Sequence, residues 1–115
     1  MKGVSGTMVL MRVFIKETDR YEGKPLYLAL LEMLKAEGLS GATALRGIAG
    51  FGAHSELHTD RILRLTNDLP AVVEVVDSEA RVQAVRPRVD AMLDSGMVTF
   101  EKVEVMSYAH PNEPD

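Results

Sequence analysis

Ala71-Val72-Val73-Glu74-Val75-Val76, which leads directly into Asp77-Ser78-Glu79, is the stretch that decides the fold. Its density of branched apolar residues is typical of a buried strand. Asp77 or Ser78 offers a side-chain oxygen that can cap a helix, and Glu79 falls in the first turn, where the helix dipole favours a carboxylate. The sequence therefore predicts a strand at 71–76 with a helix starting immediately after it.

The helix predicted after this strand has one apolar face, formed by Val82, Val85, Val89, Met92 and Leu93. Pro87 lies in its middle, and since proline removes one backbone hydrogen bond, we expect the helix to kink or restart there. Gly96 ends the helix. The alternating polarity of residues 98–105 then predicts a final strand.

The first half of the chain repeats this order. Residues 8–15 are apolar on both faces apart from Arg12, which predicts a central strand. Arg12 is then either a strand-edge or subunit contact or an anion ligand. After a polar turn, Pro25 suits the first position of a helix of about four turns, which stops at Gly38. Its buried face is expected to contain Tyr27, Leu30, Leu31 and Leu34.

A weaker strand is expected at 42–48, and a long excursion at 52–69 separates it from the strand at 71–76. The resulting order is β-α-β twice. It predicts an α+β fold, a ferredoxin-like βαββαβ plait with an antiparallel sheet and a long loop between strands two and three. Loops of this length tend to be functional.

Composition limits the function classes. The chain has 115 residues, with 13 Lys and Arg against 17 Asp and Glu, and no cysteine. The net charge of −4 argues against nucleic-acid binding, and the lack of cysteine excludes disulfides and cysteine-based zinc sites. No segment has the pattern of a signal peptide or a membrane helix, so we expect a cytoplasmic protein. One domain is expected over 1–115, with its core at about 8–106 and a flexible tail at 107–115.

Three glycines, Gly47, Gly50 and Gly52, cluster around Phe51. The backbone N–H groups of such a run can converge on an anion without steric hindrance. The spacing is not that of a dinucleotide-binding loop, and a strand bulge followed by a loop hinge explains the run as well. The residues alone leave both interpretations open.

Charged and aromatic residues supply further candidates. Arg46 and Lys102 could bind a phosphate or a carboxylate, or they could be solvated surface charges. Because the chain is acidic, its three phenylalanines are expected in the core rather than on a base-stacking surface, and these are Phe14, Phe51 and Phe100.

Two groups could carry other chemistry. His54 and His58, with Glu56 between them, could hold a metal, although no third ligand is evident and solvated loop histidines explain them too. Glu17 and Asp19 could form an acid–base pair, but turn capping or solvation is the simpler interpretation.

The run Arg46-Gly47-Ile48-Ala49-Gly50-Phe51-Gly52, together with Leu69-Pro70 and Val75-Val76-Asp77-Ser78, resembles the PII signalling proteins. Glu17-x-Asp19 and Lys24-Pro25-Leu26-Tyr27 extend the resemblance to the PII-like family labelled domain of unknown function 190. Lys102 matches a lysine that PII proteins carry after glycines, which are absent here.

This resemblance implies a homotrimer that binds a small anionic effector, often an adenine nucleotide, in clefts between subunits. The cleft would be lined by Arg46, Gly47, Gly50, Phe51, Gly52 and Lys102. The loop at 53–65 would contact a protein partner, by analogy a membrane transporter or channel, and its candidate contact residues are His54, Glu56 and His58.

We therefore expect a regulatory or sensor protein rather than an enzyme, with no catalytic residues, no metal and no cofactor other than a nucleotide effector. Two alternatives remain open. The first is a metal-binding protein or enzyme that uses His54, Glu56 and His58, and the second is a ligand-free homo-oligomeric interaction module.

Overall fold

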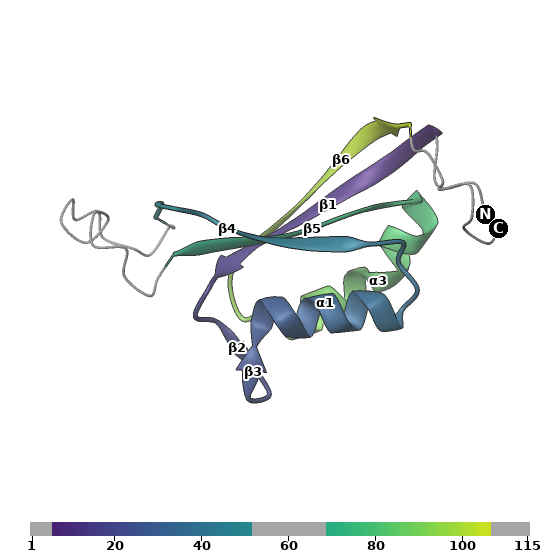
Figure 1. The fold of residues 1–115 in the computed structure, drawn as a ribbon. Coiled ribbons are helices and arrows are strands. Elements are labelled where there is room, and N and C mark those ends of the chain that lie inside the picture. The colour runs from purple at the N-terminus through teal and green to yellow at the C-terminus, as the bar shows by residue number, and fades with distance from the viewer. Residues whose placement is uncertain (1–5, 52–68, 107–115) are drawn as a thin grey trace, which may run out of the picture.

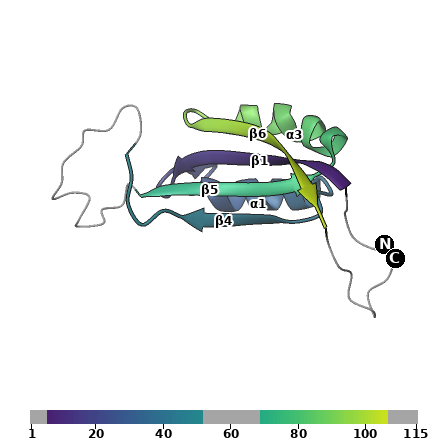
Figure 2. The ribbon, with the colours of Figure 1, turned by 90° about the horizontal axis from the view of Figure 1, so that it is seen from above.

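The computed structural model describes residues 6–51 and 69–106. In this part of the chain, four antiparallel strands form one sheet in the order β4-β5-β1-β6 (Figures 1 and 2). They are β1 (Gly6–Lys16), β4 (Ala42–Arg46), β5 (Pro70–Asp77) and β6 (Met97–Val105). The helices α1 (Leu26–Ala36) and α3 (Glu79–Met92) both lie on one face of the sheet. This arrangement confirms the predicted ferredoxin-like plait.

Alternation along the strands sends one set of side chains into the core between sheet and helices. In β1 this set is Val9, Met11, Val13 and Ile15, all nearly inaccessible to solvent. The register places Val13 opposite Val73 of β5 and opposite Val98 of β6, so one apolar layer crosses the central strands. The helices close this core with their buried faces, which consist of Leu26, Ala29, Leu30, Met33 and Leu34 from α1 and Val82, Val85, Val89 and Met92 from α3.

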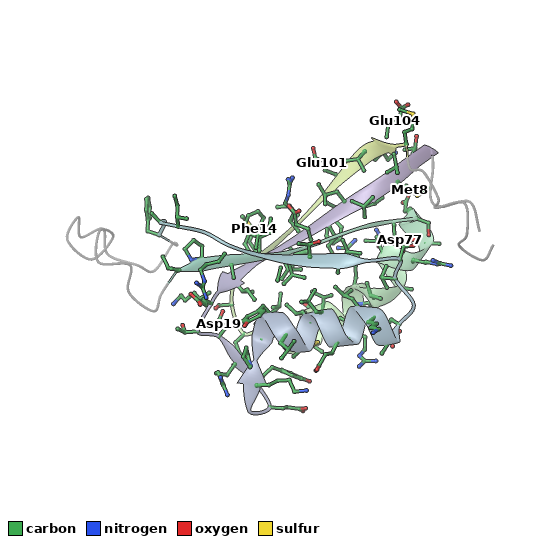
Figure 3. The ribbon with its side chains drawn as sticks, in the orientation of Figure 1. Met8, Phe14, Asp19, Asp77, Glu101 and Glu104 are labelled. Carbon is green, nitrogen blue, oxygen red and sulfur yellow. The ribbon has the colours of Figure 1, made fainter. Side chains whose placement is uncertain are left out.

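The other face of the sheet carries no helix among the described residues, and we call it the open face (Figures 1 and 3). The register assigns to it the alternate residues of each strand. Most of them are apolar and only partly buried. The apolar members are Met8, Leu10, Phe14, Leu45, Pro70, Val72, Val76, Met97, Val103 and Val105.

Several local predictions need correction. The turn before the first helix contains a small hairpin, β2 (Arg20–Tyr21) with β3 (Lys24–Pro25), which the sequence interpretation missed. Pro25 is the N-cap rather than the first helical residue, and α1 has 11 residues, which is about three turns rather than four. The strands also run one or two residues beyond or short of the expected limits.

The second helix passes through Pro87 without restarting. Val85 and Val89 lie on either side of the proline and are 1% and 2% exposed, so both adjacent turns are held against the sheet. Burial of these side chains outweighs the loss of a single backbone hydrogen bond. α3 is therefore one helix, and it ends at Met92 with Leu93 as its C-cap, before Gly96, where the sequence predicts the end.

Asp77 has a structural role that the sequence did not indicate (Figure 3). Ser78 is the helix cap, since its side chain accepts a hydrogen bond from the Arg81 N–H. The Asp77 carboxylate is 2% exposed and accepts hydrogen bonds from the Ser40 and Ser78 N–H groups, each at 2.7 Å. It thereby ties the loop after α1 to the start of α3.

The long loop predicted between the second and third sheet strands, and the predicted tail, lie outside the described residues. Among the residues that are described, no helix is long and apolar enough to cross a membrane.

Candidate functional site

The predicted glycine-rich site lies where β4 ends and β5 begins. The Gly47 N–H donates a 2.7 Å hydrogen bond to the Pro70 carbonyl, which extends the pairing of β4 with β5 by one residue. Next to it, the Glu17 N–H donates a 2.8 Å bond to the Leu69 carbonyl. The chain leaves and re-enters the sheet here, so these contacts form the rim from which residues 52–68 emerge.

Pro70 explains why two of these positions are glycine. A β-carbon on Gly47 would lie 2.6 Å from the Pro70 Cγ, and one on Gly50 would lie 3.0 Å from the same atom. Carbon atoms at such distances repel one another strongly, so only glycine lets the turn after β4 fold over the proline ring. This packing supports the hinge interpretation of the glycines without excluding a ligand role for their N–H groups.

Alanine at Gly47 is therefore expected to lower the free energy of unfolding by about 1–3 kcal/mol, because the new methyl group overlaps the ring of Pro70. Chemical denaturation of G47A, P70A and the double variant measures this. In the double variant most of the loss should be recovered, since the ring atom that the new methyl group meets is then gone. If the loss in the double variant equals the sum of the two single losses, the contact with Pro70 is not what requires glycine at position 47.

Arg46 and Glu17 form an ion pair at this rim. Arg46 is the last residue of β4 and pairs with Ala71, while Glu17 directly follows β1. The Arg46 side chain remains 66% exposed, so its guanidinium can still be reached from solvent. Glu17 therefore acts as a charge partner of Arg46, and an anion that binds Arg46 must share it with this carboxylate.

Two exposed apolar side chains follow Arg46 in the turn after β4. Ile48 is 85% exposed and Phe51 is 68% exposed. The rim thus combines exposed apolar surface, one guanidinium and closely packed backbone, a combination that can accept the apolar and the anionic parts of a small ligand.

Lys102 is not part of this cluster. Arg46 lies level with Ile15 on the β4 edge, whereas Lys102 lies opposite Val9 on the β6 edge. At roughly 4.8 Å per strand and roughly 3.3 Å per residue, the two side chains start about 25 Å apart. Within one copy of the chain they cannot grip the same small anion.

The remaining site predictions fall largely outside the described residues. Gly52, His54, Glu56 and His58 are in this group, so the proposed partner loop and the metal alternative stay predictions. Among residues 6–51 and 69–106, no group of three or more His, Asp or Glu could hold a metal ion.

The acidic pair after β1 divides into two separate roles. The Asp19 carboxylate accepts a 2.9 Å hydrogen bond from the Lys16 N–H, so it caps the turn as the simpler interpretation held. Glu17 is engaged by Arg46 instead. Their contacts give no support to an acid–base pair.

The prediction that the phenylalanines are core residues is wrong. Phe14 lies on the open face, Phe51 is exposed at the rim, and Phe100 is 36% exposed on β6. The reason is topological: no helix within residues 6–51 and 69–106 covers the open face, and β6 is an edge strand whose helix-facing side is only partly covered by α3.

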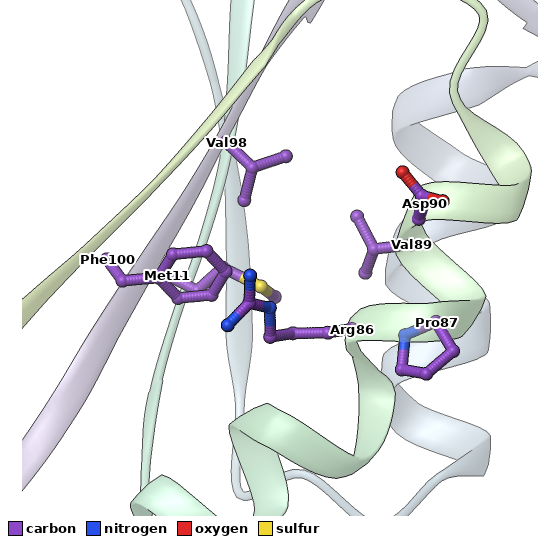
Figure 4. Close-up of a pocket in the computed structure, with 7 residues that line it drawn as sticks. All are labelled: Met11, Arg86, Pro87, Val89, Asp90, Val98 and Phe100. Carbon is purple, nitrogen blue, oxygen red and sulfur yellow. The ribbon is translucent and has the colours of Figure 1, made fainter.

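A pocket lies between α3 and β6, with a volume of about 350 Å³ (Figure 4). The Arg86 guanidinium carbon lies 4.4 Å from the centre of the Phe100 ring, a cation–π contact across the pocket. The sequence analysis missed this pocket, since only the fold brings these segments together. The lining residues are Met11, Arg86, Pro87, Val89, Asp90, Val98 and Phe100.

The chain is similar to several known proteins, in sequence and in fold. The family described as DUF190 (Uncharacterized ACR, COG1993) matches residues 8–105. A UPF0166 protein of Aquifex aeolicus is 39% identical over 97 residues, which cover 84% of this chain and 91% of that protein. A UPF0166 protein of Methanocaldococcus jannaschii is 33% identical, covering 84% and 89% respectively.

Solved structures share the fold at low sequence identity. A protein of Thermus thermophilus described as PII-like superposes with a TM-score of 0.61 at 17% identity, covering 87% of this chain and 90% of that one. CPII of Thiomonas intermedia, solved with ADP and bicarbonate, gives a TM-score of 0.52 at 19% identity, covering 86% and 88%. The same protein with ADP, AMP and acetate gives 0.53 at 14% identity, covering 91% and 94%.

Proposed function

The chain belongs to the DUF190 family, as its motifs suggested, and from this membership and its PII-like fold we propose that it is a regulatory protein rather than an enzyme. Its effector is a small anion, an adenine nucleotide in the first instance, bound in clefts between copies of the chain. The observation that carries this proposal is the ADP bound to a protein of the same fold.

The rim at the end of β4 supports this choice of site. Phe51 and Ile48 offer exposed apolar surface to a base, and Arg46 offers a fork of donors that suits phosphate oxygens. The rim also adjoins the segment at 53–65, which we propose as the part that contacts a protein partner such as a membrane transporter or channel. Ligand at the rim would act by binding one arrangement of that segment better than another.

The position of Lys102 favours a shared site. Since Arg46 and Lys102 lie on opposite edges of the sheet, both can contact one effector only if they come from different copies. The open face supplies a reason for copies to associate. It is largely apolar, no helix of the described residues covers it, and burying apolar surface away from water is favourable. We propose a homotrimer as the assembly in which these edges meet.

Substituting Arg46 tests the proposed site. Loss of a charge-assisted contact of about 1.5–3 kcal/mol predicts ADP binding about 10- to 100-fold weaker in R46Q. Titration calorimetry measures the affinity, and Arg88→Gln is the matched control, because Arg88 is also an exposed arginine in an ion pair, with Glu37. Equal ADP affinity in R46Q and the wild type would remove Arg46 from the site.

Substituting Glu17 should have the opposite effect on ADP affinity. In E17Q the carboxylate that competes for Arg46 is gone, so ADP is expected to bind up to about fivefold more tightly, the limit set by an exposed ion pair of at most about 1 kcal/mol. The same titration measures this gain. Weaker binding in E17Q would mean that Glu17 contacts the ligand itself.

A further inference from the structure

One charged cluster interrupts the open face of the sheet. Arg12 of β1 reaches Glu74 on β5, with 2.8 Å between Nε and Oε2, and Glu101 on β6, with 3.3 Å between Nη1 and Oε1. The hydrogen bond to Glu74 raises the pKa of Arg12, and the charges of both carboxylates add to this effect. One guanidinium thus connects three neighbouring strands at the middle of the face.

The surroundings of this cluster are apolar. Arg12 lies between Leu10 and Phe14 along β1, and Glu74 lies between Val72 and Val76 along β5. All four apolar neighbours are partly exposed (Figure 3 shows Phe14 and Glu101 on the side away from the helices). A contiguous exposed apolar patch of this kind is typical of an interaction surface, and here the patch surrounds the ion cluster.

The charges of the cluster are self-complementary. Arginine has five N–H donors, and only two of its nitrogens are engaged by these carboxylates. The cluster also holds two carboxylates for one cation, and Glu101 is the more exposed of them, at 57% against 29% for Glu74. A second copy can therefore offer a carboxylate to the unused donors of Arg12 and receive a guanidinium for its own excess charge.

We propose that Arg12, Glu74 and Glu101 fix the register in which copies of this chain associate through the open face. This inference rests on the homo-oligomer of the proposed function and adds what determines its geometry. Burial of apolar side chains favours association of the copies but does not select one relative orientation. A charged group among them favours only those orientations in which it stays paired with an opposite charge. Lipid is a poor occupant of this face because it offers the cluster no counter-charge in the apolar region.

The test compares single substitutions on the sheet. In R12M both carboxylates lose their cation, and association of the copies should weaken at least tenfold; in E101Q a smaller weakening is expected. Glu104→Gln is the matched control. It makes the same chemical change on β6, but Glu104 lies on the helix-facing side of the sheet rather than on the open face. Arg88→Met is the control for the arginine. Sedimentation velocity over a protein dilution series gives the affinities.

The outcomes separate this inference from the proposed function. If the wild type is oligomeric and R12M associates as tightly, the register role is overturned while the oligomer stands. A wild type that stays monomeric at all concentrations overturns both. If R12M does not fold, the triple variant Arg12→Met, Glu74→Leu, Glu101→Leu decides, because it leaves no unpaired charge. Association into mixed stoichiometries supports the proposal, and a single wild-type stoichiometry refutes it.

Discussion

Alanine at Gly96 is expected to lower the free energy of unfolding by about 3 kcal/mol. Gly96 has φ = +116°, a conformation that residues with a side chain rarely adopt, and its β-carbon would lie 2.5 Å from the Phe14 carbonyl oxygen. The backbone strain contributes about 1–2 kcal/mol and the overlap with the rigid main chain of β1 contributes a similar amount. Gly96 therefore permits the tight entry into β6, the edge strand that carries Glu101.

Gly38 provides the matched control for this prediction. It also has a positive φ, of 86°, but a β-carbon there would meet nothing within 4 Å. G38A should therefore lose only the conformational part, about 1 kcal/mol. Urea denaturation at one fixed protein concentration measures both variants, since association of copies would otherwise shift the midpoints. Equal losses in G96A and G38A would contradict the overlap with Phe14.

Replacing Asp77 by asparagine should cost about 2–3 kcal/mol at neutral pH. The carboxylate accepts N–H groups from both Ser40 and Ser78, and an amide presents one donor where an acceptor is needed. Asp94→Asn is the control, because Asp94 is an exposed residue and its substitution should change stability by no more than about 0.5 kcal/mol.

Asp77 should also make the stability of the fold depend on pH. Burial by itself would raise the pKa of Asp77, but the N–H groups of Ser40 and Ser78, aided by Arg81, outweigh it and lower the pKa. The stabilisation from Asp77 is therefore complete above its ordinary pKa of about 4 and is lost as the pH falls through the lower folded value. Thermal unfolding of the wild type and D77N should differ most at about pH 7, and the difference should shrink as the pH falls below about 4 towards the lowered pKa of folded Asp77. A constant difference across that range would contradict this linkage.

Local patterns were sufficient to predict the sheet and both helices. The branched residues of β5, the serine cap of α3 and the helical spacing of its valines each specify their element without long-range information. The short hairpin before α1 could not be predicted, because strands of two residues are too short to show a periodic pattern. At Pro87 the sequence shows only the local cost of a lost backbone hydrogen bond, which predicts a kink. The burial of Val85 and Val89, which keeps the helix continuous, depends on the fold.

The candidate site was predicted in part for the same reason. The glycine run and Arg46 are adjacent in sequence, and they do form one rim. The pairing of Arg46 with Glu17, the packing of the glycines on Pro70 and the distance to Lys102 all depend on strand order. The Arg12 cluster likewise joins residues from three strands that lie far apart in the chain, so no spacing in the sequence could reveal it.

Native mass spectrometry of the wild-type protein, titrated with ADP, tests the proposed regulatory role most directly because it counts chains and ligands in one spectrum. We expect trimers that take up one ADP per chain, and R46Q trimers that carry clearly less ADP at the concentration that half-fills the wild type. Chains that stay single, or trimers that bind no ADP at millimolar concentration, would contradict a nucleotide site shared between copies.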